Sequence, residues 1–225
     1  DFAALRSNQT EVSKIAQLLG GQSFLGETAT ELTFKQHAPE SRVLHLAMHG
    51  FLNDCDPLYS GLAFSRQARG VADEDRQEEN DGFLHAYEIY NLKMNAELAV
   101  LSACNTGRGQ LAKGEGVISL ARAFKYAGCS NVLMSLWQAD DKATAQIMQD
   151  FYRHLQKGLG KDEAIRQAKL DYLAASNRNH PFFWGAFVLI GDDAPLGQSS
   201  NWHWYAAALV LAGIGFLYWR AKRKS

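Results

Sequence analysis

The chain has 225 residues, which suits one domain with a sizeable core and a small appendage. Its 23 Lys and Arg residues nearly balance its 24 Asp and Glu residues, which argues against a nucleic-acid-binding surface. Three scattered cysteines argue against a disulfide framework, and no Cys/His cluster has the spacing of a metal site. Because the chain begins at Asp1 without a methionine, we expect a fragment or the mature part of a longer protein.

Hydrophobic periodicity predicts helices alternating with strands. Thr10 and Thr28 are the expected N-caps of the first two helices, and the charged stretch 65–82 is expected to be a surface loop. The alternation predicts an α/β sandwich with a mostly parallel sheet. In chain order the expected elements are helices 10–19 and 28–37, strands 43–48 and 62–64, a helical turn 88–92, strand 98–101, helix 116–126, strand 131–136, helices 142–156 and 161–174, and strand 186–190.

Two of these strands end in residues that suit nucleophilic catalysis. The apolar strand 98–101 runs into a turn of small residues that carries Cys104, and strand 43–48 is followed by His49. Open α/β sheets place their chemistry at the carboxyl ends of parallel strands. A histidine and a cysteine at two such ends predict the base and the nucleophile of a cysteine peptidase.

The chemistry assigns a role to each residue of this pair. A free cysteine has a pKa of about 8.5, so Cys104 needs His49 nearby to take its proton and later to protonate the leaving amine. Acyl transfer also needs backbone N–H groups as an oxyanion hole. The N–H groups of Gly50 and Cys104 are the natural donors, because glycine lets the backbone approach the substrate closely. No metal or organic cofactor is needed for this reaction.

Structural alternatives exist for the cysteines and histidines. A cysteine among apolar residues is most often a small core side chain, which fits Cys129, whereas Cys55 is expected to be a surface thiol. His45 shares a strand face with His49 and is a rival for the catalytic role. Its interior position in the strand makes a packed core histidine the better interpretation.

The C-terminal region predicts a single-pass membrane anchor. Residues 202–219 are apolar, and a helix of this length rises about 27 Å, close to the hydrocarbon thickness of a bilayer. A polar linker, 193–201, precedes them, and the basic tail 220–225 follows. A basic tail favours the cytoplasm, so the globular part is expected outside, in a periplasm or an equivalent space. Aromatic residues stand at both ends, as in interfacial belts: Trp202, Trp204, Tyr205, Tyr218 and Trp219.

The sequence resembles the CHAT-domain family of caspase-like cysteine peptidases, relatives of caspases and separase. The similarity runs from about Leu18 to Asp192 and includes LLGGQSFLGETAT, LHLAMHGF, LSACNTGRGQLAKGEGVISLARAF and HPFFWGAFVLIGD. It implies a three-layer caspase–haemoglobinase-like sandwich over residues 1–192. It also implies His49 and Cys104 as the catalytic dyad, with the amides of Gly50 and Cys104 as the oxyanion hole.

The resemblance also suggests a substrate pocket. Separase-like relatives use an acidic residue after an LW motif to contact a basic substrate side chain, and here the text is LWQADDKAT. Asp140 or Asp141 is therefore expected to favour Arg or Lys, with Trp137 as a wall of the cleft. The structural alternatives are that Asp141 is an N-cap, with Thr144 three residues on, and that Trp137 fills the core.

Three hypotheses follow. The leading one is a membrane-anchored cysteine endopeptidase that acts on protein or peptide substrates. The alternative is a latent or inactive CHAT fold that serves as a membrane-proximal protein-binding module. A nucleotide-binding domain is weaker, because GRGQLAKGEG lacks the order of a P-loop or a dinucleotide turn. CHAT domains often follow tetratricopeptide repeats, so an upstream repeat region or a regulatory partner is expected from the family alone.

Overall fold

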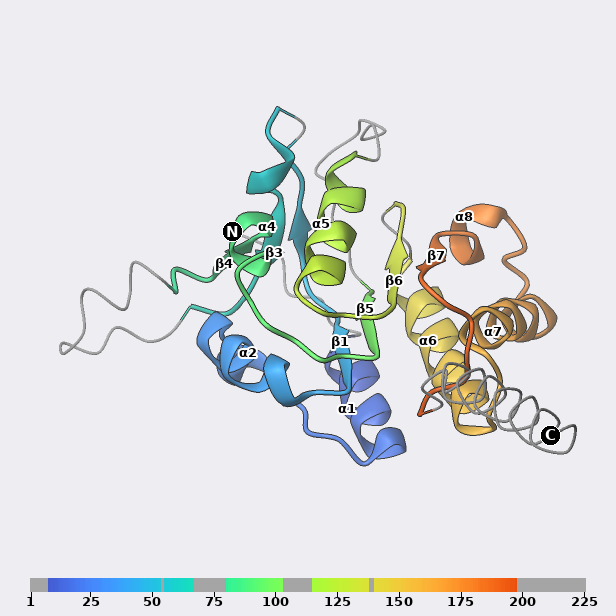
Figure 1. Cartoon of the computed structure of the whole chain (residues 1–225). Coiled ribbons are helices and arrows are strands. Elements are labelled where there is room, and N and C mark those ends of the chain that lie inside the picture. Colours follow the sequence, from blue (N-terminus) through green and yellow to red (C-terminus); the bar gives the residue numbers. More distant parts are fainter. Residues whose placement is uncertain (1–7, 54, 67–79, 103–114, 138–139, 198–225) are drawn as a thin grey trace, which may run out of the picture.

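The computed structural model describes residues 8–53, 55–66, 80–102, 115–137 and 140–197. Its central sheet has four strands in the order β1-β5-β6-β7. β1 pairs in parallel with β5, and β5 with β6, whereas β7 is antiparallel to β6. The predicted mixed α/β fold with a mostly parallel sheet is confirmed (Figure 1). The strands are β1 (Val43–Leu46), β5 (Leu98–Leu101), β6 (Val132–Ser135) and β7 (Phe187–Ile190).

Helices cover both faces of this sheet, because strand side chains alternate between two cores. Leu101 of β5 packs in one core with Phe124, and the neighbouring Val100 packs in the other with Phe151. The result is three layers, helix–sheet–helix. The first core takes its helices from α2 (Glu31–His37), α4 (Ala86–Ile89) and α5 (Glu115–Tyr126); the second takes them from α1 (Asn8–Leu19), α6 (Asp141–Gln156) and α7 (Lys161–Ala175). The short helix α8 (Pro181–Trp184) lies between α7 and β7 along the chain.

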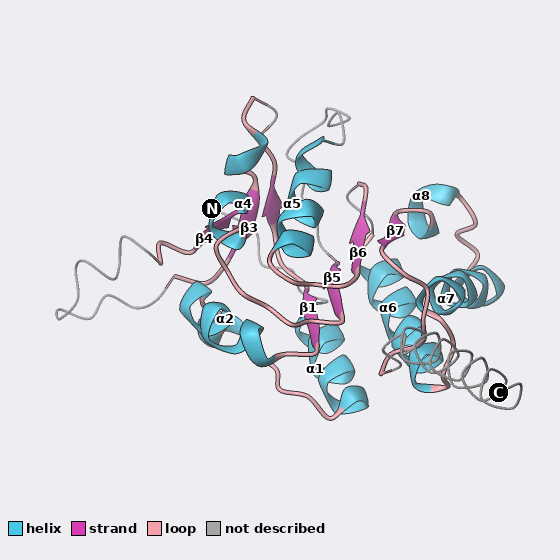
Figure 2. Cartoon of the chain, in the orientation of Figure 1, coloured by secondary structure: helices cyan, strands magenta, loops and turns pink. Residues whose placement is uncertain are grey.

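A second, smaller sheet stands next to the first (Figure 2). Its strands pair antiparallel in the order β2-β3-β4. Only β3 was anticipated, as strand 62–64, because runs of two or three residues are too short for a period-2 pattern to emerge. The strands are β2 (Gly50–Phe51), β3 (Gly61–Ala63) and β4 (Phe83–His85), and the 3₁₀ turns within the described residues cover Gly26–Thr28, Ala38–Glu40 and Pro57–Tyr59.

Element boundaries differ from the sequence expectations at the caps. Thr10 lies inside α1, and α2 is capped by Thr30, whose hydroxyl accepts from the N–H of Thr33 at 3.1 Å. Thr28 instead ends a separate 3₁₀ turn. Two threonines two residues apart offer the same capping chemistry, and the path of the backbone decides which of them is used.

The predicted membrane segment, 202–219, lies outside the described residues. Within the parts of the chain that the structure describes, no helix has both the length and the apolar character needed to cross a bilayer.

Candidate active site

Three parallel strands of the central sheet precede the predicted site residues along the chain. β5 lies between β1 and β6, so the chain leaves all three strands at the same carboxyl edge. His49 follows β1, Ser102 follows β5, and Asp140 follows β6. Cys104 lies two residues beyond Ser102, outside the described residues. The strand that leads to the predicted nucleophile is therefore flanked by those that lead to the predicted base and the predicted specificity residue.

His49 and Gly50 stand at the junction of the two sheets. β1 ends at Leu46, two residues earlier than the predicted strand 43–48. His49 therefore does not follow the strand directly but lies just before β2. Its carbonyl accepts from the N–H of Ala63 at 2.8 Å. Gly50 lies opposite Leu62, and the bond joins the residues next to them in the two strands. Gly50 and Leu62 therefore form a non-hydrogen-bonded pair of the antiparallel ladder. The N–H of Gly50 therefore points away from β3, as an oxyanion-hole donor requires.

A buried polar cluster lies directly behind these strand ends, and sequence reasoning missed it. His45 is packed in the interior, as predicted, and its Nε2 lies 3.0 Å from Oε1 of Glu11. Its Nδ1 lies 3.1 Å from the hydroxyl of Tyr152, and the hydroxyl of Ser102 donates to the same Oε1 of Glu11 at 3.1 Å. The one available signal was Glu11 itself, a carboxylate four residues before Ile15 on the apolar face of a helix.

A cavity of about 490 Å³ runs along β1 to His49. It is lined mainly by apolar and hydroxyl side chains of β1, of α2 and of residues 22–26. Its lining includes Phe24, Phe34 and Phe64, and it contains neither Asp140 nor Asp141. The cavity next to His49 is therefore separate from the predicted acidic specificity residues.

The predicted specificity residues lie at the start of α6. Asp140, rather than Asp141, is the N-cap, and its Oδ1 accepts from the N–H of Ala143 at 3.1 Å. Its Oδ2 accepts from Arg178 at 3.2 Å, whereas Asp141 is exposed in the first turn. An aspartate does cap this helix, as the structural alternative expected, but it is Asp140 and not Asp141. The N-cap is the residue just before the first helical residue, and α6 begins at Asp141.

Trp137 packs against the second core and links the segment after β6 to α8. Its indole Nε1 donates to the carbonyl of Phe182 at 3.0 Å, and its ring packs against the core formed with α6 and α7. The contact joins the end of β6 to α8. The core-filling alternative is therefore supported, and the role as a cleft wall stays a prediction.

The family model of the CHAT domain matches residues 1–192 of this chain, which is most of its length. The chain belongs to the CHAT-domain family. The resemblance noted in the sequence is thus confirmed, and with it the caspase-like character of the fold. The site residues carried over from the family remain predictions.

Two curated relatives contain a stretch similar to this CHAT domain. Tetratricopeptide repeat protein 28 of Homo sapiens is 26% identical over 223 residues, which covers 89% of this chain and 9% of that protein. The Mus musculus protein of the same name is 25% identical over 223 residues, with the same coverage. The chain therefore corresponds to less than a tenth of the length of these relatives.

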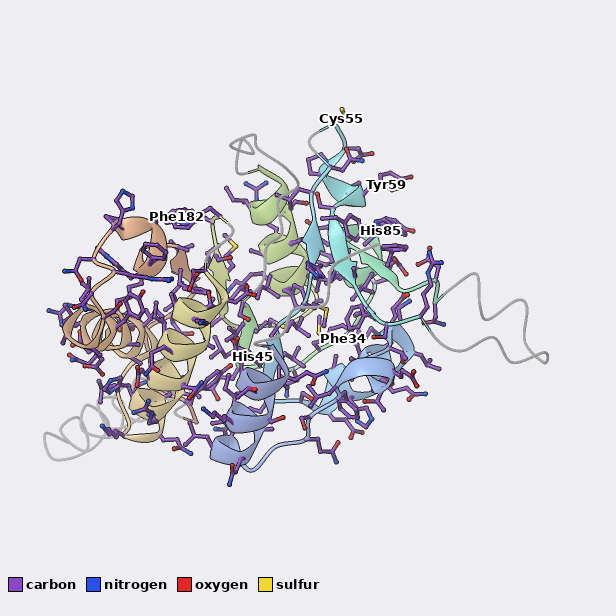
Figure 3. All side chains as sticks on the ribbon, turned by 180° about the vertical axis from the view of Figure 1, so that it is seen from behind. Phe34, His45, Cys55, Tyr59, His85 and Phe182 are labelled. Atoms are coloured by element: carbon purple, nitrogen blue, oxygen red, sulfur yellow. The ribbon has the colours of Figure 1, made fainter. Side chains whose placement is uncertain are left out.

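The other two cysteines of this CHAT domain behave as predicted. Cys55 is exposed, and Cys129 is buried (Figure 3 labels Cys55). Burial raises the pKa of the Cys129 thiol to about 12, so this side chain is a neutral core group at neutral pH. Among the described residues, no group of three His, Cys, Asp or Glu side chains is placed to hold a metal ion.

Proposed function

We propose that this CHAT domain is a cysteine endopeptidase in which His49 and Cys104 act as base and nucleophile. One observation carries the proposal: β5, which leads to Cys104, lies between β1 and β6 and runs parallel to both. Chain segments that leave adjacent parallel strands emerge side by side, which suits a two-residue catalytic pair. Membership of a caspase-like family supports the same chemistry.

The proposed reaction is acyl transfer through a thioester. His49 takes the thiol proton, and the Cys104 thiolate attacks the scissile carbonyl carbon to form a C–S bond. The amides of Gly50 and Cys104 would bind the oxyanion, and the outward N–H of Gly50 favours this role. Protonated His49 then gives its proton to the leaving amine as the C–N bond breaks. Water hydrolyses the thioester and restores the thiol.

The proposed primary specificity is for Arg or Lys, with Asp140 or Asp141 as the acidic partner. The guanidinium of Arg178, about half exposed, already pairs with Asp140 Oδ2 at 3.2 Å. This contact shows a basic group paired with that carboxylate, and it also means that Asp140 is already engaged within the domain. A substrate side chain at Asp140 would have to displace Arg178, whereas Asp141 is open to solvent.

We further propose that residues 202–219 tether the enzyme to a membrane and that the basic tail stays on the cytoplasmic side. The apolar length and the aromatic ends support the tether.

An upstream tetratricopeptide-repeat region is the proposed partner of the CHAT domain. The names of the two relatives support it, since both are tetratricopeptide repeat proteins of which this chain matches a small part.

The deciding experiment is cleavage of a peptide library by detergent-solubilised protein, with cut sites read by mass spectrometry. We expect cuts after basic residues by the wild type and none by Cys104→Ala or His49→Ala, because each removes one half of the dyad. Cys55→Ala is the matched control, since it removes an exposed cysteine that has no role in the proposed reaction and should cleave normally. Normal cleavage by either dyad variant would falsify the assignment.

The second candidate function is a latent or inactive CHAT module that binds proteins near the membrane. The names of the two relatives support a binding module, because they describe repeats and mention no enzymatic activity. Failure of an electrophilic peptide probe to label Cys104, even with the upstream region present, would support this module over the peptidase.

A further inference from the structure

We propose that Glu11 is a positioning residue for the catalytic centre. From α1 it holds together the ends of β1 and β5, the strands from which His49 and the Cys104 segment leave. This role rests on the peptidase function proposed above, and it assigns a purpose to a buried carboxylate that the dyad itself does not use. Figure 3 places His45, one of its two partners, between the sheet and α1.

One carboxylate oxygen makes both contacts. Oε1 of Glu11 lies 3.0 Å from Nε2 of His45 on β1 and 3.1 Å from the hydroxyl of Ser102 after β5. Glu11 is only 1% exposed, so water competes little for these hydrogen bonds. In such a setting, a hydrogen bond fixes the relative position of its two partners more firmly than it would in water. A shift of Glu11 therefore moves both strand ends.

Ser102 transmits this constraint toward the nucleophile. Its N–H donates to the carbonyl of Leu46 at 3.1 Å, so Ser102 is tied to the end of β1 as well as to Glu11. Ser102 comes two residues before Cys104 in the chain, so this fixed point lies next to the proposed nucleophile in the sequence. The base side is constrained in the same way, because His49 is three residues from Leu46.

Tyr152 completes the cluster from the opposite side. Burial raises the pKa of its hydroxyl well above the usual value, and the charge of Glu11 raises it further, so the phenol stays protonated. It can therefore donate to Nδ1 of His45, which leaves Nε2 as the N–H that faces Glu11. Each ring nitrogen then has one partner, and a single tautomer of His45 is favoured. A fully paired cluster of this kind defines one geometry, which precise alignment of a dyad requires.

The test compares Ser102→Ala with Ser119→Ala in the full chain. Each substitution removes one hydrogen bond of a buried serine, but Ser119 donates to the carbonyl of Pro57, away from Glu11. Glu11→Gln is the companion variant, and Ser102→Ala keeps the test valid if Glu11→Gln does not fold. Three quantities are measured: kcat and KM for peptide cleavage, the rate of iodoacetamide alkylation of Cys104 relative to Cys55 across pH, and the thermal midpoint.

For Ser102→Ala we expect kcat to fall on the order of tenfold or more with little change in KM, because small misplacements of reacting groups are costly. The ratio of Cys104 to Cys55 alkylation should fall as well, whereas Ser119→Ala should change neither quantity. Equal effects of the two serine variants would overturn the positioning role. If the wild type cleaves nothing, the peptidase proposal fails, but the alkylation ratio still decides whether Glu11 and Ser102 set the environment of Cys104.

Discussion

At the residue scale, the three cysteines form an internal comparison of thiol environments. Cys55 is exposed, and Cys129 is buried with its pKa raised to about 12 because an apolar environment disfavours the thiolate. Since the thiolate is the reactive species, burial protects Cys129 in two ways. It keeps reagents away from the sulfur, and it keeps the thiol protonated. Cys104 should differ from both if a histidine takes its proton.

We therefore predict distinct alkylation profiles in one wild-type sample. Cys104 should still react at about pH 6, and Cys129 should stay unmodified until the protein unfolds, with the exposed Cys55 as the reference thiol in the same sample. Peptide mass spectrometry after timed iodoacetamide treatment measures all three, and His49→Ala serves as the control that should move Cys104 toward the profile of Cys55. A Cys104 profile that matches that of Cys55 in the wild type would contradict activation by His49.

At the element scale, the start of α6 combines a structural and a proposed functional role in Asp140. One carboxylate oxygen caps the helix through the N–H of Ala143, and the other pairs with Arg178. A helix N-cap needs only a hydrogen-bond acceptor, whereas recognition of a basic side chain needs the negative charge. Two substitutions of the same residue can separate these roles.

Asp140→Ala should lower stability by about 1 kcal/mol through loss of the cap. Asp140→Asn should be close to wild type in stability, since asparagine caps well, and should lose the preference for Arg and Lys if Asp140 is the specificity residue. Thermal unfolding and the peptide-library cut sites provide the two readouts, with Asp141→Asn as the comparison at the exposed neighbour. Retained basic preference in Asp140→Asn together with its loss in Asp141→Asn would transfer the role to Asp141.

At the scale of the whole molecule, residues 192–197, which precede the predicted membrane segment, are hydrogen-bonded to the folded domain. The N–H of Gly197 donates to both carboxylate oxygens of Glu97, at 2.8 and 3.0 Å. The buried Lys161 donates to Asp192 at 3.1 Å and also to the carbonyl of Ala194. These contacts fasten residues 192–197 to the sheet and to α7, so the stability of the core should not depend on the residues that follow.

A chain that ends after residue 197 should therefore keep its thermal midpoint within about 2 °C, because it loses none of these contacts. It should also lose membrane association, since residues 202–219 are the proposed tether. Flotation with lipid vesicles compares it with the full chain, and removal of the basic tail 220–225 alone is the control that should still float. A full chain that stays out of the vesicle fraction would rule out the tether.

The extent to which sequence predicts this fold depends on the length of each element. α6, α7 and β5 carry long or strongly apolar patterns, and their predicted bounds agree with the structure to within one residue. β2 and β4 were not predicted, because each has too few residues to show alternation and forms only by pairing with β3. At the site, the sequence identified His49, Cys104 and Asp140 as positions next to strand or helix ends.

The sequence alone determined the alternating α/β pattern, the family and the predicted dyad, because periodicity and short motifs are local properties of the chain. Only the tertiary structure decided the strand order that puts β5 between β1 and β6, and the meeting of Glu11, His45 and Ser102. Ser102 lies 91 positions from Glu11 in the chain, so no local pattern links them. Their contact arises because α1 packs against the sheet, and the burial there makes each polar group depend on its partner.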